Sequence, residues 1–265
     1  MNYHDLNPDD LKNAIWRYMP FSEFVSLLTY QALWFSKLNI LQDRYEGLIP
    51  AAVKARMAVE NQPYKTWFNT PEHHRQIDAW PTWNETAVRE LLVVSCWFES
   101  EVESQHMWDE YGHSNESIAI KSTIGRLEKA VRRDPTISHI GRVRYVDHDV
   151  HAMSTHTASR AFELAFLKDR KFVHEQEVRI ATLNFKSPWC VAPDGKRYTP
   201  KQAAGIGQNN FDQPGLYVCV GLHDLITEVV VCPTAQPWLL NLVCRVTELA
   251  HISAPVSWSK LKPQA

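Results

Sequence analysis

Short runs of apolar residues alternate along the chain with segments in which apolar residues recur every three or four positions. The first pattern is typical of buried strands, and the second of helices that cover a sheet. Strands and helices are interspersed without strict alternation, which favours a mixed sheet over a parallel, doubly wound one. Strands are expected at residues 14–19, 32–35, 92–97, 118–121, 143–146, 178–181, 216–220, 228–232 and 256–258.

Helices are predicted where the three-to-four-residue spacing persists. Ser122 and Thr123 precede one such helix, and hydroxyl side chains at that position accept hydrogen bonds from the first turn. These elements predict an α+β (mixed α/β) fold with a central mixed, largely antiparallel sheet flanked by helices. The first expected helix begins at residue 21, and the others cover residues 51–60, 84–91, 104–111, 124–133, 157–170 and 235–250.

Two segments interrupt this pattern. Residues 61–83 are polar and aromatic and contain several prolines, which predicts irregular helices or a flap within a helical insertion at residues 51–90. Residues 186–214 are also rich in proline and predict a long loop or hairpin. No linker composition separates the parts of the chain, so a single domain spanning residues 1–265 is expected.

Composition and charge narrow the classes of function. The net charge is −2, and the densest basic group, within residues 126–133, is better explained by a solvated helix face than by nucleic-acid binding. No apolar run is long enough to span a membrane and the N-terminus lacks signal-peptide features, so no membrane partner is expected. The five cysteines show no Cys-x-x-Cys spacing, which predicts reduced thiols in a cytoplasmic protein.

The first candidate for chemistry is the acidic pair Glu175-x-Glu177. In a strand, residues two apart share a face and lie about 7 Å from one another. Two carboxylates held that close repel each other unless they face solvent, a base or a ligand. The pair therefore suits a site that stabilises a developing cation, as in glycosidic bond cleavage. The alternative is a solvated strand entry in which these carboxylates pair with Lys171 or Arg179.

A second candidate is Arg17, which lies between Trp16 and Tyr18 in an expected strand. Burial of an unpaired guanidinium is costly, and this planar group binds phosphates and carboxylates through two parallel hydrogen bonds. Arg17 is therefore a candidate anion-binding residue. The alternative is a structural salt bridge to Asp43 or Glu46.

Three further residues are candidates for a binding site. Ser95 stands at the end of an apolar strand, where side chains often face a site. Trp108 and Tyr111 would share one helix face, which could stack on a planar ring. The alternative for both rings, and the more common role of such residues, is core packing.

Metal and thiol chemistry are not favoured. His148, His151 and His156 lie close in sequence, but neither a Cys nor a second His pair accompanies them at a familiar ligand spacing. No metal is therefore expected, and the role of these three histidines is left open. Cys96 has no His partner nearby in sequence, so a thiol nucleophile is not favoured either.

Several blocks of residues occur in a recognisable order over roughly residues 14 to 235. The blocks are Trp16-Arg17-Tyr18, Ala32-Leu33-Trp34-Phe35-Ser36, Asp43-Arg44-Tyr45-Glu46, Val94-Ser95-Cys96-Trp97, Met107-Trp108-x-x-Tyr111 and Lys171-Phe172-x-His174-Glu175-x-Glu177-x-Arg179. In this order the chain resembles an uncharacterised bacterial family, domain of unknown function 2971, whose name implies no activity.

The order of Arg17, Ser95 and Glu175-x-Glu177 is also similar to the arginine–serine–glutamate arrangement of ADP-ribosyltransferases. This resemblance implies that Arg17 holds the phosphates or ribose of NAD, and that Ser95 supports the nicotinamide ribose. It implies that Glu177 binds the ribose hydroxyl and stabilises an oxocarbenium-like transition state, while Glu175 activates the acceptor. Those enzymes usually carry Ser-Thr-Ser where this chain has Ser95-Cys96-Trp97.

The leading hypothesis is therefore an ADP-ribosyltransferase-like enzyme with NAD as substrate and with Trp108 or Tyr111 stacked on nicotinamide. It would transfer ADP-ribose to an unknown protein or nucleic-acid acceptor, in bacterial conflict or phage defence. A second hypothesis is a non-catalytic sensor domain that binds a nucleotide or another anion. A third is a metal-dependent nuclease or hydrolase that uses Asp43, Glu46 and Glu175.

Overall fold

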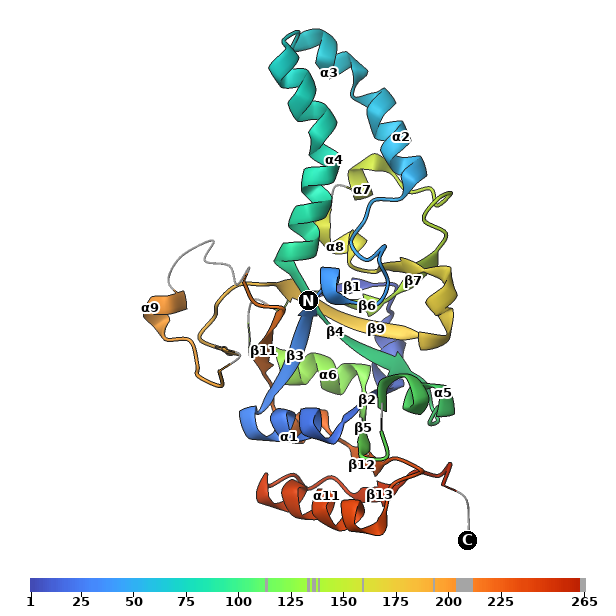
Figure 1. Cartoon of the computed structure of the whole chain (residues 1–265), viewed down its shortest axis with the longest axis vertical. Helices are drawn as coiled ribbons and strands as arrows, with labels where there is room; N and C mark the ends of the chain where they lie inside the picture. Colours follow the sequence, from blue (N-terminus) through green and yellow to red (C-terminus); the bar gives the residue numbers. More distant parts are fainter. Residues whose placement is uncertain are drawn as a thin grey trace.

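A computed structural model describes the chain except for residues 113, 133, 135, 136, 138, 159, 193, 204–211 and 263–265. Its centre is one mixed sheet of eleven strands with helices around it, so the predicted α+β fold is confirmed (Figure 1). Eight strands lie in the order β1 (Asn2–His4), β6 (His139–Arg142), β9 (Glu177–Leu183), β4 (Leu92–Glu99), β2 (Ala14–Pro20), β5 (Ser117–Thr123), β12 (Glu228–Val231) and β13 (Val256–Trp258).

The sheet is largely antiparallel, as predicted. Only the outermost pairs of that order, β1 with β6 and β12 with β13, are parallel among its described strands. A branch leaves the order at β4 and runs through β3 (Ala32–Lys37) and β11 (Gly215–Cys219) to β10 (Cys190–Val191). Antiparallel strands can be joined by short turns, which suits a chain whose strands and helices do not alternate.

The branch makes the sheet fork at β4. One edge of β4 pairs with β9 along its whole length, from Leu92 to Phe98. On the other edge, its start pairs with β3 at Val93 and Val94, and its end pairs with β2 at Phe98 and Glu99. The described strands leave residues 95–97 of β4 without a strand partner on that edge. The fork between β2 and β3 is where the functional candidates gather.

Two hydrophobic clusters form the core, one on each face of the sheet. Along β4, Val93 and Trp97 belong to one cluster, whereas Leu92 and Val94 belong to the other. This division follows from the alternation of side chains along a strand. The first cluster packs under α1 (Phe21–Tyr30), α6 (Ile124–Val131) and α11 (Pro237–Leu249), and the second under α2 (Ala51–Glu60), α4 (Pro71–Leu91) and α8 (Ala161–Leu164).

Helices α2, α3 (Gln62–Trp67) and α4 form an arm that projects from one end of the sheet (Figure 1). The helix expected to resume at residue 84 is instead the second half of α4, which runs through Pro81. A proline removes one intrahelical hydrogen bond and tends to kink a helix, but it does not have to end it. Large aromatic side chains of this arm, Trp67 and Trp83 among them, are exposed.

The prediction of one helix over residues 157–170 is wrong. The described part of this segment contains α7 (Thr155–Ala158) and α8, then strand β8 (Leu167–Asp169) and the 3₁₀ helix η4 (Arg170–Glu175). The four residues 164–167 are all fully buried, and a continuously buried run cannot lie on one helix face. Strand β8 pairs with β7 (Arg144–Val146), so the expected strand at 143–146 lies in a separate two-stranded sheet.

The remaining elements are short. The segment 186–214 contains β10 and α9 (Pro200–Ala203), and part of it lies outside the described residues. The edge strand β1 and its neighbour β6 were not predicted, because each has too few residues to show a periodicity. No helix in the described part of the chain is long and apolar enough to cross a membrane. The short helices not yet described are η1 (Pro8–Lys12), η2 (Leu38–Ile40), α5 (Gln105–Met107), the π-helix η3 (Trp108–Gly112) and α10 (Leu222–Leu225).

Candidate functional site

A cavity of about 310 Å³ lies at the fork of the sheet. Strands β2, β3, β4 and β9 and the helices η3 and η4 all contribute residues to its wall. A second hollow, of about 300 Å³, adjoins it between α1, β2 and β3, and the two share Arg17, Glu23 and Trp34. Aromatic side chains and a few charged groups line the first cavity, which is the usual make-up of a small-molecule site.

Arg17 spans the fork. Its Nη1 donates a hydrogen bond to Ser95 Oγ on β4 at 2.5 Å, and its Nη2 donates to the Trp34 carbonyl on β3 at 3.3 Å. The structural salt bridge to Asp43 or Glu46 does not form. Burial lowers the pKa of the Arg17 guanidinium, and the charge of Glu23, an exposed residue, only partly offsets this effect. Arg17 forms no ion pair among the described residues.

Glu177, at the start of β9, lines the same cavity but is held from behind by Arg179. Arg179 Nε donates to Glu177 Oε2 at 2.8 Å, and its two terminal nitrogens bind Glu46 at 2.6 and 2.7 Å. Arg179 and Glu46 are completely buried. Burial opposes the ionisation of Glu177, but the charges of Arg179 and Lys168 outweigh it and keep the pKa of Glu177 below its ordinary value.

Glu175 is the last residue of η4, so the acidic pair does not lie on one strand as expected. Gln176 between them has φ +39°, and this left-handed turn brings both carboxylates to the same cavity. Lys168 Nζ donates to Glu175 Oε2 at 2.6 Å, while Oε1 is buried with no described donor in hydrogen-bond geometry. Burial and the charge of Glu177 raise the pKa of Glu175, although Lys168 and Tyr111 counteract them.

Three carboxylates and two cations therefore share one buried cluster, formed by Glu46, Glu175, Glu177, Lys168 and Arg179. Sequence reasoning considered Arg179 as a partner of the acidic pair, but it missed Lys168 and the role of Glu46. Lys168 had been assigned to a helix, although its position in a buried apolar run was a signal that it has an ionic partner.

The trio proposed for a metal-dependent hydrolase is not gathered around a cation site. Asp43 accepts hydrogen bonds from the backbone N–H groups of Tyr45 and Asp169 at 3.0 and 2.7 Å. Glu46 binds Arg179 through both of its oxygens. Only Glu175 of the three lines the cavity.

The aromatic candidates separate. Tyr111, on η3, lines the cavity, and burial together with Glu175 raises the pKa of its hydroxyl. Trp108 does not line it. The Trp108 ring packs edge-on against Tyr18, with centroids 4.8 Å apart, and its Nε1 donates to Glu103 at 3.2 Å. Core packing, the alternative considered above, describes this environment.

Cys96 also lines the cavity. It lies in the stretch of β4 that pairs with β9 on one edge and has no described strand partner on the other. Burial and the neighbouring charge of Glu177 raise the pKa of its thiol. A thiol held protonated is a poor nucleophile, because the thiolate is the reactive form. The raised pKa thus disfavours thiol chemistry at Cys96.

The three histidines left open above do not form a metal group among the described residues. His148 is buried and stacks on Tyr45 with ring centroids 4.9 Å apart, and neither of its ring nitrogens has a hydrogen-bond partner in the described part of the chain. His151 is half-buried, and His156 is hydrogen-bonded to Arg160.

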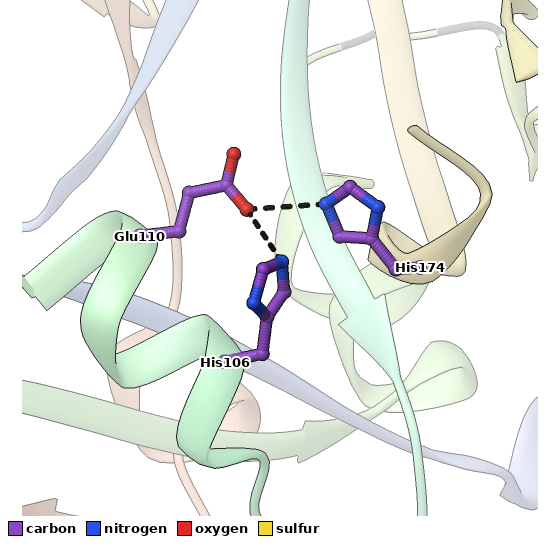
Figure 2. Close-up of side chains that lie close together, drawn as sticks. All are labelled: His106, Glu110 and His174. Atoms are coloured by element: carbon purple, nitrogen blue, oxygen red, sulfur yellow. Dashed lines mark hydrogen bonds and ion pairs between the residues drawn. The ribbon is translucent and has the colours of Figure 1, made fainter. Parts of the chain in front are cut away.

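A different group, which sequence reasoning did not anticipate, can hold a metal. It consists of His106, Glu110 and His174 (Figure 2). The spacing of His106 and Glu110, one helical turn apart in an expected helix, was the only signal. His174 precedes the acidic pair in the chain, and nothing in the sequence joins it to the other two residues.

Comparison with known proteins adds no assignment. No protein-family model, no curated protein and no solved structure matches this chain. The resemblance to domain of unknown function 2971 and to ADP-ribosyltransferases therefore rests on the residue blocks alone and stays a prediction.

Proposed function

We propose that the chain is an ADP-ribosyltransferase-like enzyme that binds NAD at the fork of the sheet and cleaves its glycosidic bond. The observation that carries this proposal is the convergence of distant residues. Arg17 and the Glu175–Glu177 pair line one cavity, and Ser95 is hydrogen-bonded to Arg17 at 2.5 Å. Arg17 and the Glu175–Glu177 pair, which are far apart in the chain, thus meet at one cavity, whereas Ser95 is buried behind Arg17 and does not line it.

The shape of the site suits a dinucleotide. Two hollows of about 310 and 300 Å³ meet at Arg17. NAD has two nucleoside halves joined by a pyrophosphate, so each hollow would take one half and the guanidinium would bind the pyrophosphate between them. The hollow with the two carboxylates would take the nicotinamide ribose. Of the two aromatic candidates, Tyr111 is the one that lines this hollow, and its ring would stack on nicotinamide.

The reaction breaks the bond between the ribose C1′ and the nicotinamide nitrogen, and the bonding electrons leave with nicotinamide. Positive charge develops on the ribose, and the ionised Glu177 would stabilise it. Arg179 fixes Glu177 in place, which keeps the carboxylate oriented before the reaction. The acceptor then forms a bond to C1′ and loses a proton, which would pass to Glu175 Oε1, an oxygen without a hydrogen-bond partner among the described residues.

The direct test is release of nicotinamide from NAD, with and without candidate acceptor proteins and nucleic acids. Glu177→Gln should abolish turnover while the circular dichroism spectrum and NAD affinity remain. The matched control is Glu99→Gln, because Glu99 is likewise held by an arginine, Arg142, but lies outside this cavity. No turnover in the native chain, together with no thermal shift by NAD, would rule the proposal out.

A second candidate is a sensor domain that binds a nucleotide without cleaving it. The observation that favours it is the engagement of Glu177, whose Oε2 is bonded to Arg179 and whose Oε1 lies 3.7 Å from Lys168. A carboxylate held this firmly also suits a purely structural role. The sensor predicts that NAD or ADP-ribose binds, that Arg17→Met abolishes binding, and that intact ligand is recovered afterwards.

A further inference from the structure

His106, Glu110 and His174 bring three metal-binding side chains to one point. Nε2 of His106 and Nε2 of His174 lie 3.1 and 3.2 Å from the same oxygen, Glu110 Oε2. The two imidazole rings meet edge-on, with centroids 4.5 Å apart. Figure 2 shows both rings directed at the Glu110 carboxylate from different segments of the chain.

We infer that this group is a binding site for a divalent transition metal of the Zn²⁺ type. Imidazole nitrogen and carboxylate oxygen are preferred donors for such ions, and Zn²⁺ binds them at about 2.0–2.2 Å. Tetrahedral geometry at that bond length separates two donor atoms by about 3.3 Å. The two nitrogen–oxygen distances of 3.1 and 3.2 Å are already close to this value, and all three donor atoms lie within 4.8 Å of one another.

The ligand set fits a site that keeps a coordination position open. Three protein ligands leave the fourth position of a tetrahedral ion for water or another small ligand. The exposure of the side chains, 59% for His106 and 38% for His174, lets an ion enter from solvent. Glu110, which is only 20% exposed, lies between them and supplies the negative charge.

The position of the group gives the ion a second consequence. His106 and Glu110 belong to the α5–η3 segment, whereas His174 belongs to η4. Both segments also form the wall of the cavity, through Tyr111 on one side and Glu175 on the other. A bound ion would therefore cross-link two segments that form part of the cavity wall. Helix η3 is a π-helix, a form that occurs frequently at functional sites.

This inference goes beyond the proposed reaction and does not depend on it, since none of the three ligands lines the cavity. It is tested with Co²⁺ and Zn²⁺ on the full chain without an affinity tag. We expect about one ion per chain, with the visible absorption of tetrahedral Co²⁺, which Zn²⁺ displaces. Hydrogen exchange of the backbone in residues 105–112 and 170–176 should slow when the ion is bound.

Single substitutions identify the ligands. His106→Gln, Glu110→Gln and His174→Gln should each weaken binding by at least about tenfold, since even the loss of a residue that only supports a ligand costs that much. His223→Gln is the control, because His223 is exposed and lies elsewhere. Circular dichroism checks that every variant is folded.

Two outcomes would overturn the inference. The first is the absence of one-to-one binding and of the Co²⁺ spectrum in the native chain. The second is that folded Glu110→Gln and His174→Gln chains bind as tightly as the native chain, or that His223→Gln weakens binding as much as they do. Metal binding is measured without NAD, so the presence or absence of NAD turnover does not decide it. The metal site and the proposed NAD reaction can therefore fail separately.

Discussion

The two strands that flank β4 at the cavity each carry an arginine, and the two arginines have opposite surroundings. Arg179 on β9 is completely buried and binds two carboxylates and the Ala165 carbonyl. Arg17 on β2 is partly buried and binds only the Ser95 hydroxyl and the Trp34 carbonyl. One charge is neutralised within the protein, and the other is not.

This difference separates a residue that holds the fold from a residue that can bind a ligand. Removal of one member of a buried ion pair leaves its partner charged and desolvated, which is strongly destabilising. A guanidinium without a carboxylate has its charge still available, and bidentate binding of a phosphate would satisfy it. We therefore expect substitutions of Arg179 to affect stability first, and substitutions of Arg17 to affect binding first.

The largest expected effect is that of Arg179→Met. The substitution leaves Glu46 and Glu177 buried without their guanidinium, and the free energy of unfolding should fall by about 3–5 kcal/mol. Urea denaturation followed by circular dichroism measures it. Arg142→Gln serves as the matched control, because Arg142 also binds two carboxylates but is 31% exposed. Equal losses in the two variants would show that burial does not set the difference.

The second prediction concerns Ser95, the one side chain among the described residues that accepts a hydrogen bond from Arg17. Ser95→Ala removes the hydroxyl that accepts from both Arg17 and Trp97, at 2.5 and 3.3 Å. Because these donors are left without a partner, stability should fall by about 1–3 kcal/mol. The same substitution made together with Arg17→Met should cost clearly less. An unchanged cost in the double variant would contradict the importance of the Arg17–Ser95 bond.

The contrast between the two arginines could be foreseen only in part from the sequence. A charged residue inside an apolar run marks Arg17, and the Glu-x-Glu spacing marks the acidic pair, because burial of charge is costly anywhere. Strands with an apolar pattern of their own, such as β2, β4 and β9, were predictable. The partners were not predictable, since Glu46 and Arg179 meet only through the packing of the helices and loops around β9.

One wrong prediction, at residues 164–167, and one missed group, which contains His106 and His174, have the same cause. The segment 164–167 reads as helix by its spacing, yet it is buried on all sides and ends as strand β8. His106 and His174 lie far apart in the chain, and only the docking of α5 and η3 beside η4 brings them together. Local patterns describe which faces are apolar, whereas tertiary packing decides which polar groups meet.

The third prediction is a small change in stability with a large change in binding. Arg17→Met removes a charge that forms no ion pair among the described residues, so the free energy of unfolding should change by less than about 1 kcal/mol. Ser95 Oγ keeps the hydrogen bond from Trp97 Nε1. NAD affinity, measured by calorimetry, should fall at least about tenfold, as expected for the loss of a charged hydrogen bond worth about 1.5–3 kcal/mol. A stable fold with unchanged NAD affinity would remove Arg17 from the site.

The smallest effect is expected from Arg142, whose partly exposed ion pairs serve as a reference for Arg179 and Arg17. Its guanidinium lowers the pKa of Asp10 from 3.8 to about 2. Burial opposes the ionisation of Glu99, but hydrogen bonds from Arg142 and Asn13 lower its pKa below 4.5. Both folded-state pKa values are depressed, so the stabilisation is complete above pH 4.5 and is lost as the pH falls towards 2.

The measurement compares the native chain with Arg142→Gln in urea at a series of pH values. The difference between their free energies of unfolding should be present at neutral pH and should shrink as the pH falls through the depressed folded-state pKa values, of which that of Asp10 is about 2. High salt should shrink it at neutral pH, because exposed ion pairs are screened. If the difference between the native chain and Arg142→Gln grows on acidification, Arg142 stabilises the fold by packing and not by its ion pairs. The different exposure of Arg142 and Arg179 would then not explain their different effects on stability.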